Sequence, residues 1–438
     1  MQPLHNKSDD PKLEARLTEI LDLLYSFYDT PIDMSLERVE RFLAQLDNPH
    51  LKLPPVIHVA GTNGKGSTIA CLRSILEAHG KRVHVVTSPH LVHPTERIRL
   101  AGELIFTQEL VDVLEECLAV NRAEPITFFE MFMAASFLVM SRVPADYVIL
   151  ETGMGGRLDA TNVIPNPVCT IITTISKDHE KFLGDTLDKI AFEKAGIMKV
   201  DVPCVIGKQT NEEVITVFEN RARELNAPLY LYDRAWCEGY PTSNLVGEHQ
   251  IYNCGVAIQA SKIILSDDFD AELLSFESKD NPLKNIHWPG RLQNIMEGHL
   301  YDLLQDDQEL WLDGGHNDSA GVALAKQCEA WQEDDNHPLH LIVAMVNRKI
   351  PAEFLEPLAP YTDSITVTSI PEEASSYSAD ELYDLVQSLG FNSVNKAKTT
   401  LEAIKAINDP NARILITGSL YFVGYLLGTQ KICGKNPF

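Results

Sequence analysis

The sequence predicts an α/β protein: a doubly wound, mainly parallel sheet domain of the P-loop type, followed by a smaller, Rossmann-like α/β domain. Three observations lead to this prediction. Apolar runs of strand length alternate with segments of helical period through the first two thirds of the chain. A glycine-rich segment with one lysine stands between the first run and the first helical segment. A less regular stretch, 281–309, separates this part from a second alternation.

Four runs in the first part are rich in β-branched residues and almost continuously apolar. This character is typical of parallel strands that are covered on both faces. Between the runs, residues 67–79 and 128–141 have the period of helices. The predicted strands are 56–60, 82–87, 147–151 and 168–175.

The second alternation begins with ELWLDGG and continues with LHLIVAM and ARILITGS, at 309–315, 339–345 and 412–419. A chain of 438 residues is too long for one core, because a domain typically has about 150 residues. We place the boundary near residue 295, which gives an N-terminal domain, 1–295, and a C-terminal domain, 296–438.

Composition excludes several classes of protein. The chain is 45% hydrophobic and 23% charged, as in soluble globular proteins. Its net charge of -25 argues against a nucleic-acid partner, since nucleic-acid phosphates attract the opposite sign. The cysteines form no CxxC motif, which favours reduced thiols in a cytoplasmic protein. Neither a signal peptide nor a membrane span is indicated, because the longest apolar patch, 128–140, contains Glu130.

The segment HVAGTNGKGST, 58–68, predicts a phosphate-binding loop between a strand and a helix. Only Thr62 and Asn63 separate Gly61 from Gly64, whereas the regular Walker A pattern has four residues there. Small residues still let backbone N–H groups approach a phosphate, and Lys65 reaches the β- and γ-phosphates. A glycine turn without a ligand is the alternative, but such a turn has no need of the lysine.

The loop therefore predicts that the chain binds and uses ATP. Ser67 or Thr68 is expected to cap the following helix or to meet a magnesium ion. The expected ATP contacts in this loop are Thr62, Asn63, Gly64, Lys65, Gly66, Ser67 and Thr68.

The loop resembles that of the Mur ligase superfamily, and specifically of its folylpolyglutamate synthase and dihydrofolate synthase branch. Further blocks resemble the same branch and follow in its order, from about residue 30 to residue 424. A series of collinear blocks is far more specific than one loop. These blocks are TSPHLVHPTERIRL (87–100), LETGMGGRLDATN (150–162), SKDHEKFLGDTLDKIAFEKAGIMK (176–199), PGRLQ (289–293), LDGGHN (312–317) and TGSLYFVG (417–424).

Glu151 ends a buried strand just before the TGMGG turn, where α/β sheets place ligand-contacting groups. A carboxylate facing a triphosphate would hold Mg²⁺; a charged strand end in solvent is the alternative. The resemblance implies two metal ions, with Ser88 and His179 as further ligands and Glu151 bridging. From the residues alone, His179 is more often a hydrogen-bonded structural histidine.

Lys194, in FEKAGIM, matches a lysine that family members carry in carbamylated form, and the resemblance implies a catalytic role for it. Sequence does not reveal a modification. On composition alone, a helix-surface lysine paired with Asp188 or Glu193 would be favoured.

Other blocks match nucleotide and glutamate positions of the family. Asn253 would meet the adenine, and Arg291 and Asp313 would contact the nucleotide from the domain junction, so that domain closure assembles the site. The resemblance puts His316, as a catalytic residue, and Ser419 near the incoming glutamate. A histidine and a serine at strand ends also cap helices, which remains an alternative.

The segment DTPIDMSLERV, 29–39, resembles the part of a dihydropteroate pocket in bifunctional family members. An N-capped helix start, with Asp33 or Ser35 as the cap, is the alternative. The candidate pterin contacts are Thr30, Ile32, Asp33 and Met34.

The resemblance implies a monomeric, cytoplasmic ligase of folate biosynthesis and one-carbon metabolism. It would use ATP and Mg²⁺ to join L-glutamate to folates, and to dihydropteroate, through an acyl phosphate. Two alternatives remain: another Mur-type amino-acid ligase, which would not be expected to share these blocks together, and a nucleotide-binding module without ligase activity, which would not need the metal-bridging set.

Two segments of the second domain depart from the family pattern. AMVNRKIP has Arg348 and Ile350 where family members carry acidic residues, and only Lys349 is retained. DGGHND stands in place of DGAHNP.

Overall fold

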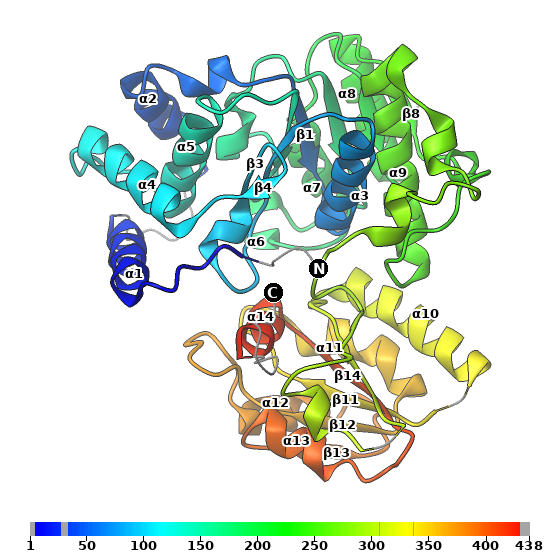
Figure 1. Ribbon diagram of the computed structural model, residues 1–438. Coiled ribbons are helices and arrows are strands. Elements are labelled where there is room, and N and C mark those ends of the chain that lie inside the picture. The colour runs from blue at the N-terminus through cyan, green and yellow to red at the C-terminus, as the bar shows by residue number, and fades with distance from the viewer. Residues whose placement is uncertain (1–4, 28–33, 306, 336, 430–438) are drawn as a thin grey trace. The chain divides into compact units, whose positions relative to one another are not determined.

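The computed structural model describes residues 5–27, 34–305, 307–335 and 337–429. Within them the chain divides into two compact units (Figure 1). The first unit contains His5–Asn244 and Ile251–Ile286; the second contains Leu245–Gln250 and the chain from His287 onward. The boundary expected near residue 295 lies inside the second unit.

The first unit is built on a sheet that has eight strands among the described residues, in the order β4-β3-β2-β5-β1-β6-β7-β8. Strands β2, β5, β1, β6, β7 and β8 run parallel, and β3 and β4 add an antiparallel edge. The strands are β1 Val56–Ala60, β2 Val83–Val86, β3 Ile98–Leu100, β4 Glu103–Leu104, β5 Tyr147–Glu151, β6 Cys169–Ile172, β7 Cys204–Ile206 and β8 Leu229–Leu231.

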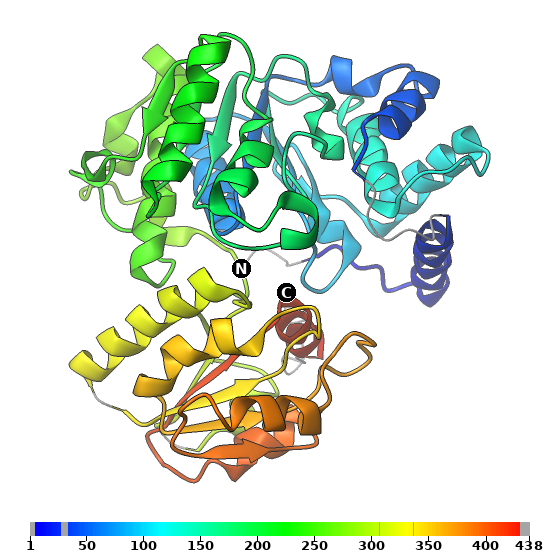
Figure 2. The same ribbon diagram turned by 180° about the vertical axis from the view of Figure 1, so that it is seen from behind.

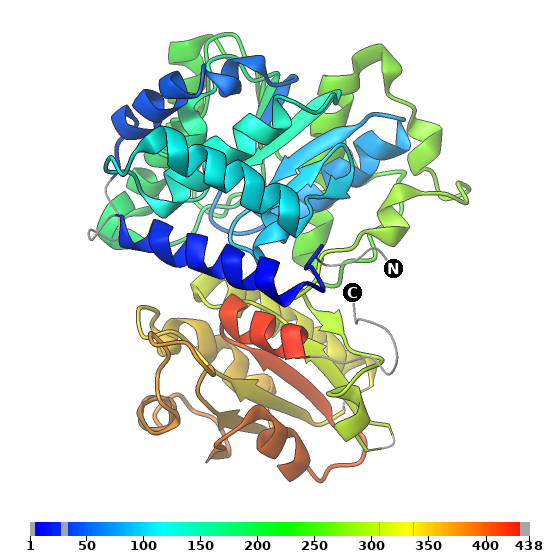
Figure 3. The ribbon, with the colours of Figure 1, turned by 60° about the vertical axis from the view of Figure 1, so that its left-hand side comes forward.

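Helices cover both faces of this sheet (Figures 1 and 2). Leu150 of β5 shares a hydrophobic cluster with α5, and Ile206 of β7 shares another with α7 and α8 on the same face. Helices α3 and α9 lie on the opposite face, and α1 runs along α4 (Figure 3). The helices are α1 Pro11–Ser26, α2 Glu37–Gln45, α3 Lys65–Ala78, α4 Thr107–Asn121, α5 Phe128–Met140, α6 Glu180–Leu183, α7 Leu187–Ala195, α8 Glu212–Leu225 and α9 Glu248–Leu265, of which the part from Ile251 onward belongs to this unit.

The second unit has a sheet with six described strands, in the order β13-β12-β11-β14-β10-β9. All pairs are parallel except β9 with β10. Helices α10, α11 and α12 share one hydrophobic cluster with the sheet. The elements are β9 Gln293–Asn294, β10 Glu309–Leu312, β11 Leu339–Val343, β12 Ser364–Val367, β13 Val394–Lys396, β14 Arg413–Thr417, α10 Asp318–Asp334, α11 Pro351–Leu355, α12 Ala379–Val386, α13 Thr400–Ala406 and α14 Leu420–Thr429.

The predicted fold class is confirmed, with two mainly parallel sheets in series. The predicted strands 56–60 and 147–151 coincide with β1 and β5. Strands β2 and β6 end before residues 87 and 175, because the chain turns into loops at their carboxyl ends. In the described ranges no helix is long and apolar enough to cross a membrane. The cysteines described there are free thiols, and all but Cys237 are buried.

Arg413 of β14 makes a largely enclosed ion-pair cluster in the second unit. Its side chain is 5% exposed, and it donates to Glu309 at 2.8 Å and to Asp335 at 2.7 Å. Its guanidinium lies 4.7 Å from the centre of the Trp331 ring. This one side chain therefore joins β10, β14 and the end of α10.

Replacing Arg413 by alanine is expected to lower the free energy of unfolding by about 2–4 kcal/mol. Removing one partner leaves the carboxylates uncompensated, although both keep some contact with water, which reduces the cost. Urea unfolding followed by fluorescence measures the change. Arg221→Ala is the control, because Arg221 pairs with Glu224 on an exposed helix face. Equal losses in both variants would contradict the structural role of Arg413.

Candidate active site

The motif loops of the first unit meet at one edge of its sheet. β2, β5, β1 and β6 are parallel neighbours, so their carboxyl ends lie side by side. Ser88 follows β2, Glu151 ends β5, Gly61 follows β1, and His179 comes after β6. In α/β sheets this edge is where ligands bind.

The predicted phosphate loop connects β1 to α3. Gly64 has φ 87° and occupies the N-cap position, so α3 begins at Lys65. Ser67 and Thr68 therefore lie inside the first turn, and the prediction that either caps the helix is wrong. Both are buried, and among the described residues Thr68 Oγ1 has no hydrogen-bond partner.

Hydrogen bonds fix the shape of this loop against the end of β6. The N–H of Thr62 donates to Thr174 O at 3.0 Å, and its hydroxyl donates to Ser176 O at 3.0 Å. The hydroxyl of Thr173 donates to Asn63 O at 2.7 Å. A Cβ on Gly61 would overlap the Thr173 side chain, so a glycine is required there. Contacts within the protein therefore fix the shape of the phosphate loop.

Lys65 lies next to Glu151. Its Nζ donates to Gly61 O at 3.1 Å and is 3.9 Å from Glu151 Oε1. The other oxygen of Glu151 accepts the backbone N–H of Ser88 at 2.9 Å. Glu151 is only 5% exposed, so the alternative of a solvent-exposed strand end is wrong. The loop lysine and the buried carboxylate therefore face the same space.

His179 lies at the start of α6, with φ 54°. Its side chain is 46% exposed, and its Nε2 is 3.9 Å from Asp178 Oδ1. In the part of the chain that the structure describes, no group of three or more His, Cys, Asp or Glu side chains is placed to hold a metal ion. The role of His179 as a metal ligand stays a prediction.

Lys194 is buried, which excludes the alternative of a helix-surface lysine. It is 5% exposed, and its Nζ donates to Gly61 O at 3.0 Å. Burial lowers the pKa of Lys194 to about 7, and the nearby charge of Lys65 acts in the same direction. A large fraction of the Lys194 side chains is therefore neutral near pH 7.

The TGMGG turn explains why Lys194 is buried. The Cβ of a residue at Gly156 would come within 2.8 Å of Glu193 O and 3.0 Å of Lys194 O. The N–H of Arg157 donates to Glu193 O at 2.8 Å. Because Gly156 has no side chain, the turn packs directly on the backbone of α7 and holds Lys194 against the phosphate loop.

Asn253 of α9 lies over the phosphate loop. It is 7% exposed, and its side chain occupies the space that a Cβ on Gly64 would need. An amide side chain can both donate to and accept from a heteroaromatic base. The contact of Asn253 with adenine stays a prediction.

Gly64→Ala is expected to raise the Kd for ATP at least tenfold, because a Cβ there would overlap Asn253 and a positive φ costs about 1–2 kcal/mol. Calorimetric titration with ATP measures the effect. Gly80→Ala is the matched control: Gly80 also has a positive φ, 73°, but nothing lies within 4 Å of its Cβ position. Equal affinities for ATP in the two variants would contradict the assigned position of Asn253.

Three predicted residues of the second unit, Asp313, His316 and Ser419, also follow strand ends, whereas Arg291 lies just before β9. Asp313 follows β10 and accepts the N–H groups of Leu292 at 2.9 Å and Gly315 at 2.7 Å. Arg291 donates to Gly290 O at 3.0 Å. His316 Nδ1 is 2.9 Å from Gly314 O, and Ser419, buried after β14, accepts the N–H of Tyr421 at 3.1 Å.

The pterin prediction falls partly on residues outside the described ranges, namely Thr30, Ile32 and Asp33. Met34 is described and packs beside the TGMGG turn, 3.5 Å from the Cβ position of Gly155. Helix α2 begins at Glu37 with Leu36 at its N-cap position, so the alternative in which Ser35 caps this helix is wrong. Met34 therefore lies at the same edge as the phosphate loop.

Sequence reasoning missed the aromatic rings at the start of α5. The Phe129 ring covers Gly153 of the TGMGG turn, so closely that a Cβ there would be 2.5 Å from the ring. Phe128 stacks on Tyr25 at 4.3 Å, and Arg97 lies 5.4 Å from its centre. The sequence pattern predicted only that these residues belong to a helix, 128–141. The Thr127–Glu130 capping box, visible in the sequence, marks this helix start.

A buried polar network supports the same turn. His58 Nε2 lies 2.9 Å from Thr161 Oγ1 and 3.1 Å from Thr152 Oγ1, and burial lowers its pKa to about 3, so the ring is neutral. Thr161 donates to Asp159 at 2.6 Å, and Asp159 accepts the N–H of Met154 at 2.8 Å. The network ties β1 to the turn that follows Glu151.

Comparison with known proteins identifies the family. The model of the Mur ligase middle domain matches residues 59–232, and that of the dihydrofolate synthetase C-terminal domain matches 298–429. Dihydrofolate synthetase of Saccharomyces cerevisiae is 32% identical over 425 residues, which cover 90% of this chain and 97% of the relative. The chain belongs to the folylpolyglutamate synthase/dihydrofolate synthase family.

Solved structures of family members share this fold. E. coli FolC in complex with DHPP and ADP has a TM-score of 0.80 and 26% identity, over 95% of this chain and 98% of that one. A bifunctional folylpolyglutamate synthase/dihydrofolate synthase with Mn, AMPPNP and L-glutamate bound has a TM-score of 0.77 and 27% identity, over 94% and 97%.

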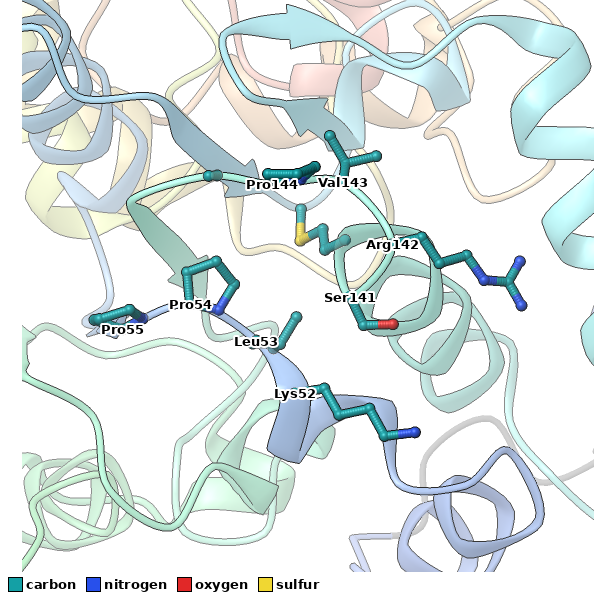
Figure 4. A pocket seen from close by; sticks show the side chains of 10 residues that line it. Lys52, Leu53, Pro54, Pro55, Ser141, Arg142, Val143 and Pro144 are labelled. Atoms are coloured by element: carbon teal, nitrogen blue, oxygen red, sulfur yellow. The ribbon is translucent and has the colours of Figure 1, made fainter.

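A hollow elsewhere in this family member is not part of the candidate site (Figure 4). Its volume is about 320 Å³, and its lining includes Pro54, Pro55 and Pro144. Pro55 immediately precedes β1, and Pro144 comes shortly before β5. The hollow therefore lies at the amino edge of the strands, opposite the edge that carries the family motifs.

Proposed function

We propose that this chain uses ATP to join the amine of L-glutamate to the carboxylate of dihydropteroate, and that a folate is its second acceptor. The observation that carries the choice of acceptor is the dihydrofolate synthetase C-terminal model, which spans 298–429, together with a dihydrofolate synthetase relative that aligns over 97% of its length. ATP-dependent ligation of glutamate to folates is the activity of the family to which the chain belongs.

The reaction has two steps. An oxygen of the acceptor carboxylate attacks the γ-phosphorus of ATP, the bond to the bridging oxygen breaks, and ADP leaves. The glutamate nitrogen then attacks the acyl carbon, the C–O bond to phosphate breaks, and the nitrogen loses a proton. The acceptor carboxylate is itself the nucleophile, so the protein supplies mainly position and charge.

The phosphate loop is suited to the first step. The N-terminus of α3 and the loop N–H groups favour an anion, and Lys65 adds a full positive charge. Bonds from Thr62, Thr173 and Lys65 fix the loop shape. Little reorganisation is needed when charge moves onto the leaving phosphate oxygens.

Oxygen atoms at this edge fit a hard divalent cation. Glu151 offers a buried carboxylate, and Thr68 offers a buried hydroxyl on the first turn of α3. We propose that Glu151 and Ser88 hold Mg²⁺, with His179 at a second ion. A bound Mg²⁺ would neutralise phosphate charge during transfer.

We also propose that Lys194 carries a carbamate. Its neutral nitrogen adds to CO₂ and releases one proton, which leaves a carboxylate on the side chain. The lowered pKa, about 7, makes the reactive neutral amine abundant at physiological pH. The contact of Nζ with Gly61 O, 3.0 Å, would place the new charge beside the phosphate loop.

The remaining assignments concern the nucleotide and the glutamate. We propose that Asn253, Arg291 and Asp313 contact ATP, and that His316 and Ser419 contact L-glutamate from the second unit.

We further propose a cytoplasmic monomer; size-exclusion chromatography with light scattering should give the mass of one chain, 48.9 kDa. A dimer mass would overturn that proposal.

Phosphate release from ATP, measured with a panel of acceptors, tests the proposed reaction. Dihydropteroate, tetrahydrofolate and a UDP-muramoyl precursor are each supplied with and without L-glutamate, and products are identified by mass. Release should require L-glutamate together with dihydropteroate or the folate. Dependence on the UDP-muramoyl precursor, or release without any acceptor, would overturn the proposal.

A further inference from the structure

Three neighbouring strands of the second unit end at one edge of its sheet. In the order β11-β14-β10 they are parallel, and each is followed by a loop. The N–H of Gly418, after β14, donates to Gly315 O at 3.1 Å, and the N–H of Ala344, after β11, is 3.4 Å from Thr417 O. The three loops are therefore in contact, and they bring His316, Ser419 and Arg348 to the same edge.

The loop that carries Arg348 is fastened on its outer side. The N–H of Asn347 donates to Ser375 O at 2.7 Å. The hydroxyl of Tyr377 lies 3.3 Å from Asn347 O and 3.1 Å from Lys349 O. The backbone on both sides of Arg348 is thus held by one neighbouring segment.

Arg348 itself is exposed, and its side chain is directed toward the loop after β14. Its Nη2 is 3.4 Å from the hydroxyl of Tyr421, and its guanidinium carbon is 5.9 Å from the centre of that ring. Tyr421 is 43% exposed, and its N–H donates to Ser419 Oγ. Among the described residues, no carboxylate forms an ion pair with Arg348. Its charge is thus available to an anion from solution.

The chemistry of the substrate gives this charge a use. L-Glutamate carries two carboxylates, and a guanidinium donates to both oxygens of a carboxylate at once. The protein has a net charge of -25, which repels anions. A local positive charge is therefore needed to bind the two carboxylates of L-glutamate. Arg348 stands where the family pattern has an acidic residue. The positive charge at this position therefore distinguishes this chain from that pattern.

We propose that Arg348 is a specificity residue that binds a carboxylate of the incoming L-glutamate, with Tyr421 setting the orientation of its guanidinium. The inference rests on the proposed function and deepens it. It assigns part of glutamate recognition to the loop after β11, in addition to His316 and Ser419.

Steady-state kinetics of Arg348→Ala and Arg348→Lys test the proposal. Arg348→Ala should raise KM for L-glutamate at least tenfold, with KM for ATP and for dihydropteroate within twofold of the parent enzyme. Arg348→Lys should recover part of the loss, because it keeps the charge but not the planar fork. Lys398→Ala is the control: Lys398 is an exposed cation after β13, at the same sheet edge but farther along it. An unchanged KM for L-glutamate in Arg348→Ala would overturn the proposal.

Calorimetric titration with L-glutamate, in the presence of ADP and phosphate, keeps this test separate from that of the reaction. If the parent enzyme binds L-glutamate and Arg348→Ala binds it more weakly, the result supports the role of Arg348, even where no turnover is seen. Absence of turnover would then overturn the proposed reaction but not the glutamate site. Equal binding by both proteins overturns the role of Arg348, whatever the turnover.

Discussion

Replacing Lys65 by methionine is expected to lower kcat by about 10²- to 10³-fold, the usual cost of losing one group that stabilises transition-state charge. Lys65 lies at the first position of α3, beside Glu151. In the proposed reaction its charge stabilises the transferring phosphate. Methionine keeps the length of the side chain and removes its charge, together with the hydrogen bonds that Nζ donates to Gly61 O and Thr62 O. Phosphate release at saturating ATP, dihydropteroate and L-glutamate measures kcat.

Lys52→Met is the matched control for this variant. Lys52 is a partly exposed cation of the same unit, it pairs with Asp47, and it lines the hollow at the amino edge of the sheet. Its kcat should equal that of the parent enzyme. If Lys65→Met turned over as fast as Lys52→Met, the phosphate loop would not be the site of phosphoryl transfer.

Lys194→Ala is expected to reduce kcat by about 10²-fold or more, because it removes the side chain that we propose carries an anionic carbamate beside the phosphate loop. Adding acetate or formate should restore part of the activity, since a small carboxylate fits the space that the side chain leaves. The measurement is kcat as a function of the concentration of the added acid. Rescue by a small acid requires that the lost side chain leave an enclosed space, and the Lys194 side chain is only 5% exposed.

The parent enzyme should show a matching dependence on pH and CO₂. Below pH 7 the amine of Lys194 is mostly protonated and does not add to CO₂; above pH 7 it is mostly neutral, because burial lowers its pKa to about 7. Activity should therefore fall as the pH drops through 7, and it should fall further when bicarbonate and CO₂ are removed. Insensitivity to CO₂, together with no rescue of Lys194→Ala, would contradict the carbamate.

The fold was predictable where local pattern decides it. The runs at β1 and β5 are apolar and bounded by polar or glycine-rich segments, and their bounds were found without error. The start of α3 was predicted two residues too late, at residue 67. Gly64 takes a positive φ, which the sequence pattern does not show, and the helix therefore begins at Lys65.

The burial of Lys194 was not predictable from its helix. On α7 it looks like an ordinary surface lysine, and the packing that buries it comes from Gly156, far away in the sequence. The same holds for Phe129, whose ring covers Gly153. Both contacts depend on glycines whose missing side chains let distant segments approach. The family motif indicated Lys194, whereas nothing in the apolar period indicated Phe129.

The division of the chain into units shows a further limit of pattern reading. Leu245–Gln250 belongs to the second unit, although the residues on either side of it belong to the first. A sequence pattern reports elements one after another, and it does not report a chain that passes between two units and returns. A single boundary could not have described this arrangement.

In the proposed reaction the acceptor carboxylate is activated as an acyl phosphate. Dihydropteroate labelled with ¹⁸O in both carboxylate oxygens tests it directly, by mass spectrometry of the phosphate released in the presence of ATP and L-glutamate. One ¹⁸O atom should appear in each phosphate, and the other should remain in the amide. Phosphate without the label would contradict acyl-phosphate formation.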